Sequence, residues 1–169
     1  MRISCIILAR GGSKGIPKKN IIDFCGKPLI AWTIMQAMGA KEVADVWVSS
    51  DSNEILEISR RYGANAIIRP ENISGDYESS ESAWKHAIDF IESKSKQSID
   101  YVLAPQVTSP LRDASDFSNA ICQINAEKAD SLLSVAKIEY FFIWGRKNTE
   151  NPHSINYDYK DRKPRQLID

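Results

Sequence analysis

The sequence opens on ISCIILARGGSKGIPKKN, residues 3–20, and this stretch decides the fold. Its first part, Ile3 to Leu8, is an apolar run typical of a buried strand in an α/β sheet. The loop that follows carries glycines at 11, 12 and 15, which let the backbone approach a ligand and turn its N–H groups toward an anion. The cations around the same loop are Arg10, Lys14, Lys18 and Lys19. This pattern predicts a polyphosphate-binding loop.

A solvated basic surface loop is the alternative interpretation of this stretch. The preceding apolar strand favours a ligand site, because ligands of open α/β sheets gather at the carboxyl ends of strands. The glycine spacing fits neither the G-x-x-x-x-G-K-[ST] loop of nucleotide hydrolases nor the G-x-G-x-x-G turn of dinucleotide-binding proteins. A plain NTPase or a dehydrogenase is therefore disfavoured.

Length and composition narrow the class of protein. At 169 residues and 43% hydrophobic, the chain can bury one sizeable core, and we expect a single α/β domain over residues 1–169. The 22 basic residues balance the 22 acidic ones, so the chain has no net positive charge that would indicate binding to nucleic acid or to an anionic membrane. Two widely separated histidines do not indicate a metal site.

Cysteine usage and hydropathy indicate the compartment. The three cysteines are widely separated and form no C-x-x-C pair, which argues against a disulfide framework or a zinc ribbon. The N-terminal apolar run is too short for the core of a signal peptide, and no stretch approaches the length of a membrane span. We therefore expect a cytoplasmic protein.

Strand and helix patterns alternate along the chain. Helices are expected from Pro28 to Ala40, from a cap at Asp51 or Ser52 to Tyr62, from Ser80 to Lys94, and after a cap at Asp113 or Ser115. Further strands are expected over residues 43–49, 66–68, 101–104 and 132–136. This order predicts a three-layer α/β fold with a mostly parallel sheet and right-handed crossovers. Trp84 is expected in the core, and the charged, aromatic tail over 147–169 is expected to be irregular.

Polar loops follow several of these strands. They are residues 10–20, 50–52, 69–70 and 106–112, and the carboxyl ends of parallel strands bring such loops to one edge of the sheet. Their side chains supply cations for phosphates, hydroxyl groups for base and sugar edges, and the amide of Gln106 as a donor and acceptor. The sequence therefore predicts a pocket for a nucleotide and a polyol.

These segments together resemble the acylneuraminate cytidylyltransferases, which make CMP-sialic acid and relatives such as CMP-legionaminic acid. The resemblance spans the chain, and five motifs occur in order. They are Leu8 to Gly15 with Lys19-Asn20, Gly26-Lys27-Pro28-Leu29-Ile30, Ser50-Asp51-Ser52, Arg69-Pro70 with Asp76 and Ser79-Ser80, and Gln106-Val107-Thr108-Ser109-Pro110-Leu111-Arg112. The resemblance implies a Rossmann-like nucleotide-diphospho-sugar transferase topology.

The same resemblance implies roles for individual residues. The implied catalytic residues, which hold the CTP phosphates, are Arg10, Lys14 and Lys19. The implied nucleotide-binding residues are Ala9, Gly11, Gly12, Ser13, Asn20, Arg69 and Ser80, of which Ser13 also contacts phosphate and Arg69 and Ser80 help to read the cytosine. Gln106 and Arg165 are implied to bind the acceptor sugar. Asp51 and Asp76 are equally well explained as a helix cap and a turn cap, so we leave both out of the catalytic set.

The implied reaction is attack by the anomeric hydroxyl of a nonulosonic acid on the α-phosphate of CTP, with release of pyrophosphate and Mg²⁺ as cofactor. In the family, the metal-binding aspartates and the dimer-forming extension follow the part seen here. The metal ligands and a family-like homodimer therefore stay open, and CTP binding with little or no turnover is expected. Val107 stands where the family usually has proline, and residues 140–144 replace a His-Pro and lysine segment of some members, closer to the legionaminate-type branch.

Two alternatives to a CMP-nonulosonate synthetase stay open. One is a CTP- or CMP-binding domain without turnover, which release of pyrophosphate would distinguish. The other is a sugar nucleotidyltransferase that uses another base, in which case ATP, GTP or UTP would protect the fold better than CTP.

Overall fold

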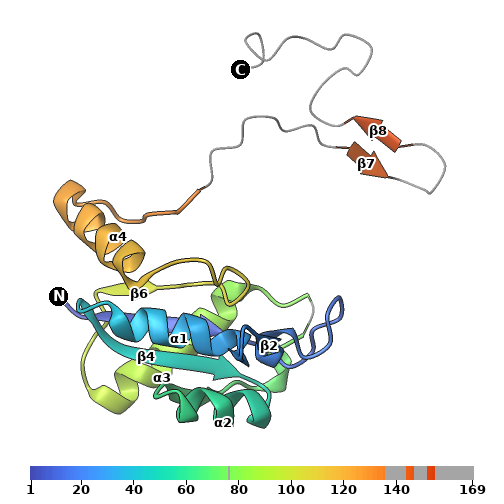
Figure 1. The fold of residues 1–169 in the computed structure, drawn as a ribbon. Helices are drawn as coiled ribbons and strands as arrows, with labels where there is room; N and C mark the ends of the chain where they lie inside the picture. Colours follow the sequence, from blue (N-terminus) through green and yellow to red (C-terminus); the bar gives the residue numbers. More distant parts are fainter. Residues whose placement is uncertain (76, 136–143, 147–151, 155–169) are drawn as a thin grey trace. The chain divides into compact units, whose positions relative to one another are not determined.

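The structure is a computed structural model that describes residues 1–75, 77–135, 144–146 and 152–154. The chain divides into two compact units, Met1–Asp130 and Ser131–Asp169. The first unit carries an α/β sheet with helices, and the second carries a short antiparallel hairpin (Figure 1). The expectation of a single domain over residues 1–169 stays a prediction. In the described part of the chain, no helix is both long and apolar enough to cross a membrane.

The sheet of the first unit is parallel throughout. Its strands are β1 (Ile3–Leu8), β4 (Val43–Ser50), β5 (Asn65–Ile68) and β6 (Tyr101–Leu103), in the order β5-β4-β1-β6. Strand β1 is central, and its first residue, Ile3, lies opposite both Val43 and Tyr101. These strands confirm the expected ones to within one residue at each end.

Four helices cover the two faces of the sheet. They are α1 (Leu29–Gly39), α2 (Asn53–Arg61), α3 (Ser80–Ser95) and α4 (Ala114–Glu127). Side chains on β1 alternate between the faces, so Cys5 packs with residues of α1, α2 and α4, whereas Ile6 packs with residues of α3. The expected three-layer arrangement is confirmed.

The order of the strands reverses beside β1. From β1 the chain passes outward through β4 to β5, and then crosses back along α3 to place β6 on the other side of β1. The loops after β1 and β6 therefore leave the sheet in different directions, and a crevice opens between them at the carboxyl ends of these strands.

A short hairpin precedes α1, and the sequence pattern did not predict it. Strands β2 (Asp23–Phe24) and β3 (Lys27–Pro28) pair through a turn in which Cys25 has φ 53° and Gly26 has φ 81°. Two positive φ angles in succession are typical of the two-residue turns that match the twist of paired strands. The remaining short elements are two 3₁₀ turns, η1 (Lys19–Ile21) and η2 (Glu71–Ile73).

One expectation about the C-terminal part is wrong. Residues 132–135 of the strand expected over 132–136 do not pair with another strand, and the side chains of Leu133 and Val135 are each 83% exposed; Ala136 lies outside the described residues. In the tail, β8 (Pro152–Ser154) pairs antiparallel with β7 (Trp144–Arg146), which precedes it. The other tail residues, 147–151 and 155–169, lie outside the described residues, so the expectation of an irregular tail stays a prediction. An apolar run becomes a strand only where its backbone finds a partner, and local sequence does not determine that partner.

Candidate functional site

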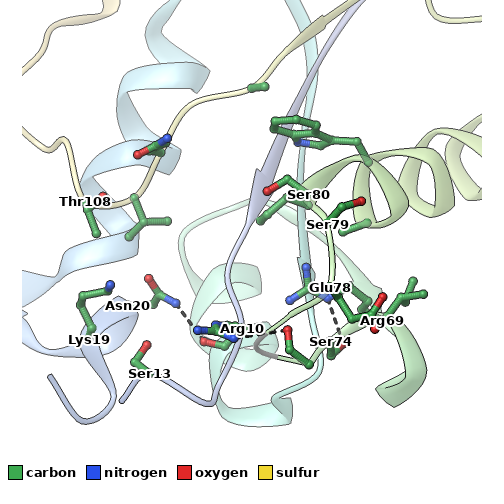
Figure 2. Close-up of a pocket in the computed structure, with 18 of the residues that line it drawn as sticks. Arg10, Ser13, Lys19, Asn20, Arg69, Ser74, Glu78, Ser79, Ser80 and Thr108 are labelled. Carbon is green, nitrogen blue, oxygen red and sulfur yellow. Dashed lines mark hydrogen bonds between the residues drawn. The ribbon is translucent and has the colours of Figure 1, made fainter. Parts of the chain in front are cut away.

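A cavity of about 470 Å³ lies at the carboxyl ends of β1 and β6 (Figure 2). Three stretches of the chain surround it: the loop after β1, the segment from Arg69 into the first turns of α3, and the loop after β6. The predicted site residues that line it are Arg10, Ser13, Lys14, Lys19, Asn20, Arg69, Ser80 and Gln106. The fold thus brings together residues that are up to 96 positions apart, from Arg10 to Gln106.

The loop after β1 is held in place at both of its ends. The N–H of Ala9 donates to the carbonyl of Ser49, 3.0 Å away, which extends the pairing beyond the end of β1. The side chain of Asn20 is buried, and its Nδ2 donates to the carbonyl of Arg10 at 2.9 Å. Ala9, a predicted nucleotide-binding residue, is also buried and does not line the cavity.

Asp51 ties the middle of this loop to the end of β4. Its Oδ1 accepts a hydrogen bond from the N–H of Gly11 at 2.8 Å. A Cβ atom on Gly11 would lie 3.0 Å from the Cβ of Ser52, a tight contact that glycine avoids. Ser52 is the N-cap residue of α2, without a side-chain capping bond. Asp51 therefore positions the loop, a role that the expected helix cap did not include.

The four cations that line the cavity are not the four that the sequence pattern predicted around the loop after β1. Arg10, Lys14 and Lys19 line the cavity, and Nη1 of Arg10 donates to the carbonyl of Gly75 at 3.3 Å. The Nζ of Lys18 instead lies 2.7 Å from Oε2 of Glu54 on α2, in an exposed ion pair. Arg69 is the fourth cation that lines the cavity.

Arg69 is an unusual cation because only 6% of it is exposed. Its Nε donates to Oγ of Ser74 at 3.1 Å. Burial lowers the pKa of the guanidinium, the Asp51 carboxylate raises it, and the neighbouring Arg10 lowers it. An arginine retains its proton even so, and the cavity therefore contains a fixed, desolvated positive charge.

The loop after β6 carries Gln106, and Arg112 fixes its backbone. Nη2 of Arg112 donates to the carbonyl of Gln106 and to Oγ1 of the buried Thr33, each at 3.0 Å. The guanidinium lies 5.1 Å from the ring centre of Phe117 on α4, a cation–π geometry. The sequence motif included Arg112 but did not indicate this positioning role.

The first turns of α3 form a neutral wall of the cavity. Ser79 is the N-cap of α3, and its Oγ accepts a hydrogen bond from the N–H of Ser82 at 3.3 Å. Figure 2 shows Ser79 and Ser80 on this side of the cavity, with Ser13 and Lys19 on the opposite side. Trp84 packs against the core as expected, and it also lines the cavity, which the sequence pattern did not predict.

The remaining predicted residues lie elsewhere. Gly11 and Gly12 belong to the loop but do not line the cavity, and a Cβ on Gly12 would have no atom within 4 Å. Arg165 and Asp76 lie outside the described residues. The assigned ligand contacts of the site residues stay predictions.

The described residues do not fit a metal centre that the protein holds by itself. In residues 1–75, 77–135, 144–146 and 152–154, no three or more His, Cys, Asp or Glu side chains gather into a possible metal site. Glu78 is the one carboxylate that these residues contribute to the lining of the cavity.

Comparison with known proteins identifies the family. The sequence matches the cytidylyltransferase family over residues 4–155. The chain belongs to the cytidylyltransferases. A cytidylyltransferase for pseudaminic acid from Campylobacter jejuni subsp. jejuni serotype O:23/36 is 38% identical over 166 residues, which cover 98% of this chain and 71% of that protein. N-acylneuraminate cytidylyltransferase A of Danio rerio is 38% identical over 144 residues, which cover 84% of this chain and 32% of that protein.

Solved structures confirm the expected nucleotidyltransferase fold. CMP:2-keto-3-deoxy-manno-octonic acid synthetase complexed with CTP superposes with a TM-score of 0.61 at 25% identity, over 76% of this cytidylyltransferase and 49% of that chain. A cytidylyltransferase from Leptospira borgpetersenii serovar Hardjo-bovis superposes with a TM-score of 0.60 at 17% identity, over 76% of this chain and 51% of that chain. The chain is therefore a nucleotidyltransferase of the Rossmann-like nucleotide-diphospho-sugar transferase fold.

Proposed function

We propose that this cytidylyltransferase joins CMP from CTP to a nonulosonic acid and releases pyrophosphate. The observation that carries the proposal is the cavity beside β1, which combines several cations with neutral hydrogen-bonding groups. A triphosphate needs the cations, whereas a base and a polyol need the hydroxyl and amide groups. The names of the relatives, cytidylyltransferases for pseudaminic and acylneuraminic acids, support this choice of substrates.

The residues of the cavity would act by positioning and by neutralising charge. Arg10, Lys14 and Lys19 would hold the phosphates and offset the negative charge that develops on the leaving pyrophosphate. Gln106, with its backbone fixed by Arg112, would hold the acceptor near the α-phosphate. CTP is expected to enter as its Mg²⁺ complex, and we assign no side chain of the chain to that ion.

Pseudaminic acid is the first acceptor to test. Two Campylobacter jejuni relatives with that activity in their names match 98% of this chain, at 38% and 37% identity. N-acetylneuraminate is the second, because the acylneuraminate enzymes match 84%, 96% and 82% of the chain at 38%, 34% and 36% identity. A cytoplasmic location belongs to the same proposal, and it is supported by the three cysteines, which are all unpaired.

Release of pyrophosphate from CTP tests the proposal. The purified chain is mixed with MgCl₂, CTP and either pseudaminic acid or N-acetylneuraminate, and a reaction without sugar is the control. We expect CTP to bind and the release to depend on the sugar but to be slow, and we expect Gln106→Ala to reduce the release further while the affinity for CTP is unchanged.

Other outcomes would favour the alternatives. CTP binding without release for either sugar would support a binding domain without turnover. Stronger thermal protection by ATP, GTP or UTP than by CTP would support a sugar nucleotidyltransferase for another base.

A further inference from the structure

The cavity has two chemically different sides. One side carries Lys14 and Lys19 from the loop after β1, together with Ser13. On the other side, next to Arg69 and Glu78, a neutral wall is formed by the N-cap Ser79, by Ser80, Ala83 and Trp84 of α3, and by Leu8 of β1. If the triphosphate lies on the cations, as the proposed function requires, the base lies against the neutral side.

Trp84 is a partly buried residue on that neutral side. It follows Ser80 by four residues on α3, so both side chains lie on the same face of the helix. Its indole packs against the core cluster that contains Ile6, Ala87 and Ile91, each 0% exposed. Close-packed cores do not yield easily to an inserted group. Moving the indole away from the cavity would therefore disturb this packing.

The indole also brings a hydrogen-bond donor that nothing else in the fold uses. Nε1 of Trp84 is buried, and among the described residues it has no hydrogen-bond partner. Buried indole N–H groups are ordinarily hydrogen-bonded, because a buried donor that has lost its water and has no other acceptor destabilises the fold. A carbonyl or ring nitrogen of a bound base would supply the missing acceptor.

We propose that Trp84 is the specificity-determining residue that limits this site to a single-ring base and donates its N–H to that base. The cavity, at about 470 Å³, is at the lower part of the range for small-molecule sites and must also hold the ribose and the phosphates. We expect the second ring of a purine to meet the indole. This inference rests on the proposed function, because that function places the base beside α3.

Calorimetry with CTP, ATP and GTP tests the inference on the purified chain, without any need for turnover. The variants are Trp84→Ala, Trp84→Leu and Trp84→Phe. Trp32→Phe is the matched control, because Trp32 lies on α1 outside this cavity and donates its Nε1–H to the carbonyl of Phe24. Thermal melting of every variant shows which of them are folded.

We expect the wild type to bind CTP much more tightly than either purine nucleotide. Trp84→Ala or Trp84→Leu should bring the ATP and CTP affinities closer together by about tenfold or more, through a gain for ATP. Trp84→Phe should keep the exclusion of purines, because its ring still fills the space, while losing about fivefold in affinity for CTP with the N–H. Trp32→Phe should change neither affinity.

The possible failures can be told apart. A folded wild type that does not bind CTP would overturn the proposed function. A wild type that binds CTP, with an unchanged ratio of ATP to CTP affinity in the folded Ala or Leu variant, would overturn the role of Trp84 in size selection alone. Unchanged CTP affinity in Trp84→Phe would overturn the donation by Nε1.

Discussion

Lys18 and Lys19 are neighbours in the sequence but take part in different interactions. Lys19 lines the cavity, whereas Lys18, at φ 52°, forms an exposed ion pair with Glu54. Exposed ion pairs contribute little to stability, so Lys18 can be changed with small effect on the fold. Lys18 is therefore a matched control for the cations that line the cavity.

Arg10→Ala and Lys14→Ala should each weaken CTP binding more than CMP binding. A charge-assisted contact to an outer phosphate contributes about 1.5 to 3 kcal/mol, which is roughly tenfold or more in affinity. CMP lacks those outer phosphates and should lose less. Isothermal titration calorimetry with both nucleotides measures the difference, and Lys18→Ala should leave both affinities unchanged. Equal losses for CTP and CMP would mean that Arg10 and Lys14 act on the fold or on the base.

The sequence predicted which loop carries the charges but not which partner each residue has. The glycines and cations after the apolar run from Ile3 to Leu8 were enough to place the loop at the cavity. The contact between Asp51 and Gly11 joins residues 40 apart, and it depends on β1 and β4 lying side by side. Such contacts follow from the tertiary pairing of strands, which no local pattern contains.

At the scale of elements, the packing of α1 against α4 depends on one glycine. Gly39 ends α1, and a Cβ on it would lie 2.9 Å from the Cβ of Ala114, the first residue of α4. This distance is shorter than carbon atoms tolerate. The two helices can approach this closely because Gly39 has no side chain.

Gly39→Ala should therefore destabilise the protein, although alanine favours helices over glycine. We expect a loss of about 1 to 3 kcal/mol from overpacking between the two helices. Urea unfolding followed by circular dichroism measures the change. Gly12→Ala is the control for stability, because a Cβ there meets no atom within 4 Å. A Gly39→Ala variant as stable as the wild type would show that α4 shifts at no cost.

The loop after β6 provides a second prediction at this scale. Arg112→Lys keeps the positive charge, but it loses the planar guanidinium, whose Nη2 donates both to the Gln106 carbonyl and to Oγ1 of Thr33. We expect a higher KM for the acceptor sugar, with CTP affinity within about twofold of wild type. Steady-state kinetics and calorimetry measure the two quantities, and Arg60→Lys, on the exposed face of α2, is the control. Parallel losses of CTP affinity and melting temperature would assign Arg112 to the fold alone.

The elements themselves were predictable where apolar periodicity was strong, as in β1 and α3. The hairpin of β2 and β3 was missed because its turn is Cys25-Gly26, and cysteine is not a residue that indicates such turns. The apolar run over 132–136 was read as a strand because composition alone does not reveal whether a neighbouring strand is available.

At the scale of the whole molecule, the reactivity of the Cys5 thiol measures whether the core is folded. It lies in the central strand β1 and is 0% exposed, whereas Cys25 and Cys122 are exposed. Burial raises the pKa of the Cys5 thiol well above its ordinary value of 9.0, with Arg112 lowering it and Asp45 raising it by smaller amounts. The folded protein therefore holds this thiol neutral over the range in which an unfolded chain would ionise it.

Two consequences follow for measurements on Cys5. A thiol reagent at neutral pH should modify Cys25 and Cys122 rapidly and Cys5 only at the rate of global unfolding, which mass spectrometry can separate. Because the folded pKa is raised, the stability that Cys5 contributes is full below pH 9 and should fall as pH rises further. The Cys5→Ala variant should lose less stability over that alkaline range. Rapid labelling of Cys5 in the native protein would contradict the buried position.

The central place of β1 in the sheet also constrains the order in which the protein can fold during synthesis. Strand β1 emerges first from the ribosome, and the N–H of Arg2 finds its partner Asp100 only 98 residues later. Until β6 is made, one edge of β1 has no backbone partner, and an unpaired edge is a template for association with another chain. Such distant pairing slows folding and lengthens the exposure of the edge. A nascent chain that stalls before Tyr101 therefore has the whole loop after β1 but an incomplete sheet to support it, and the open edge of β1 favours association with another chain.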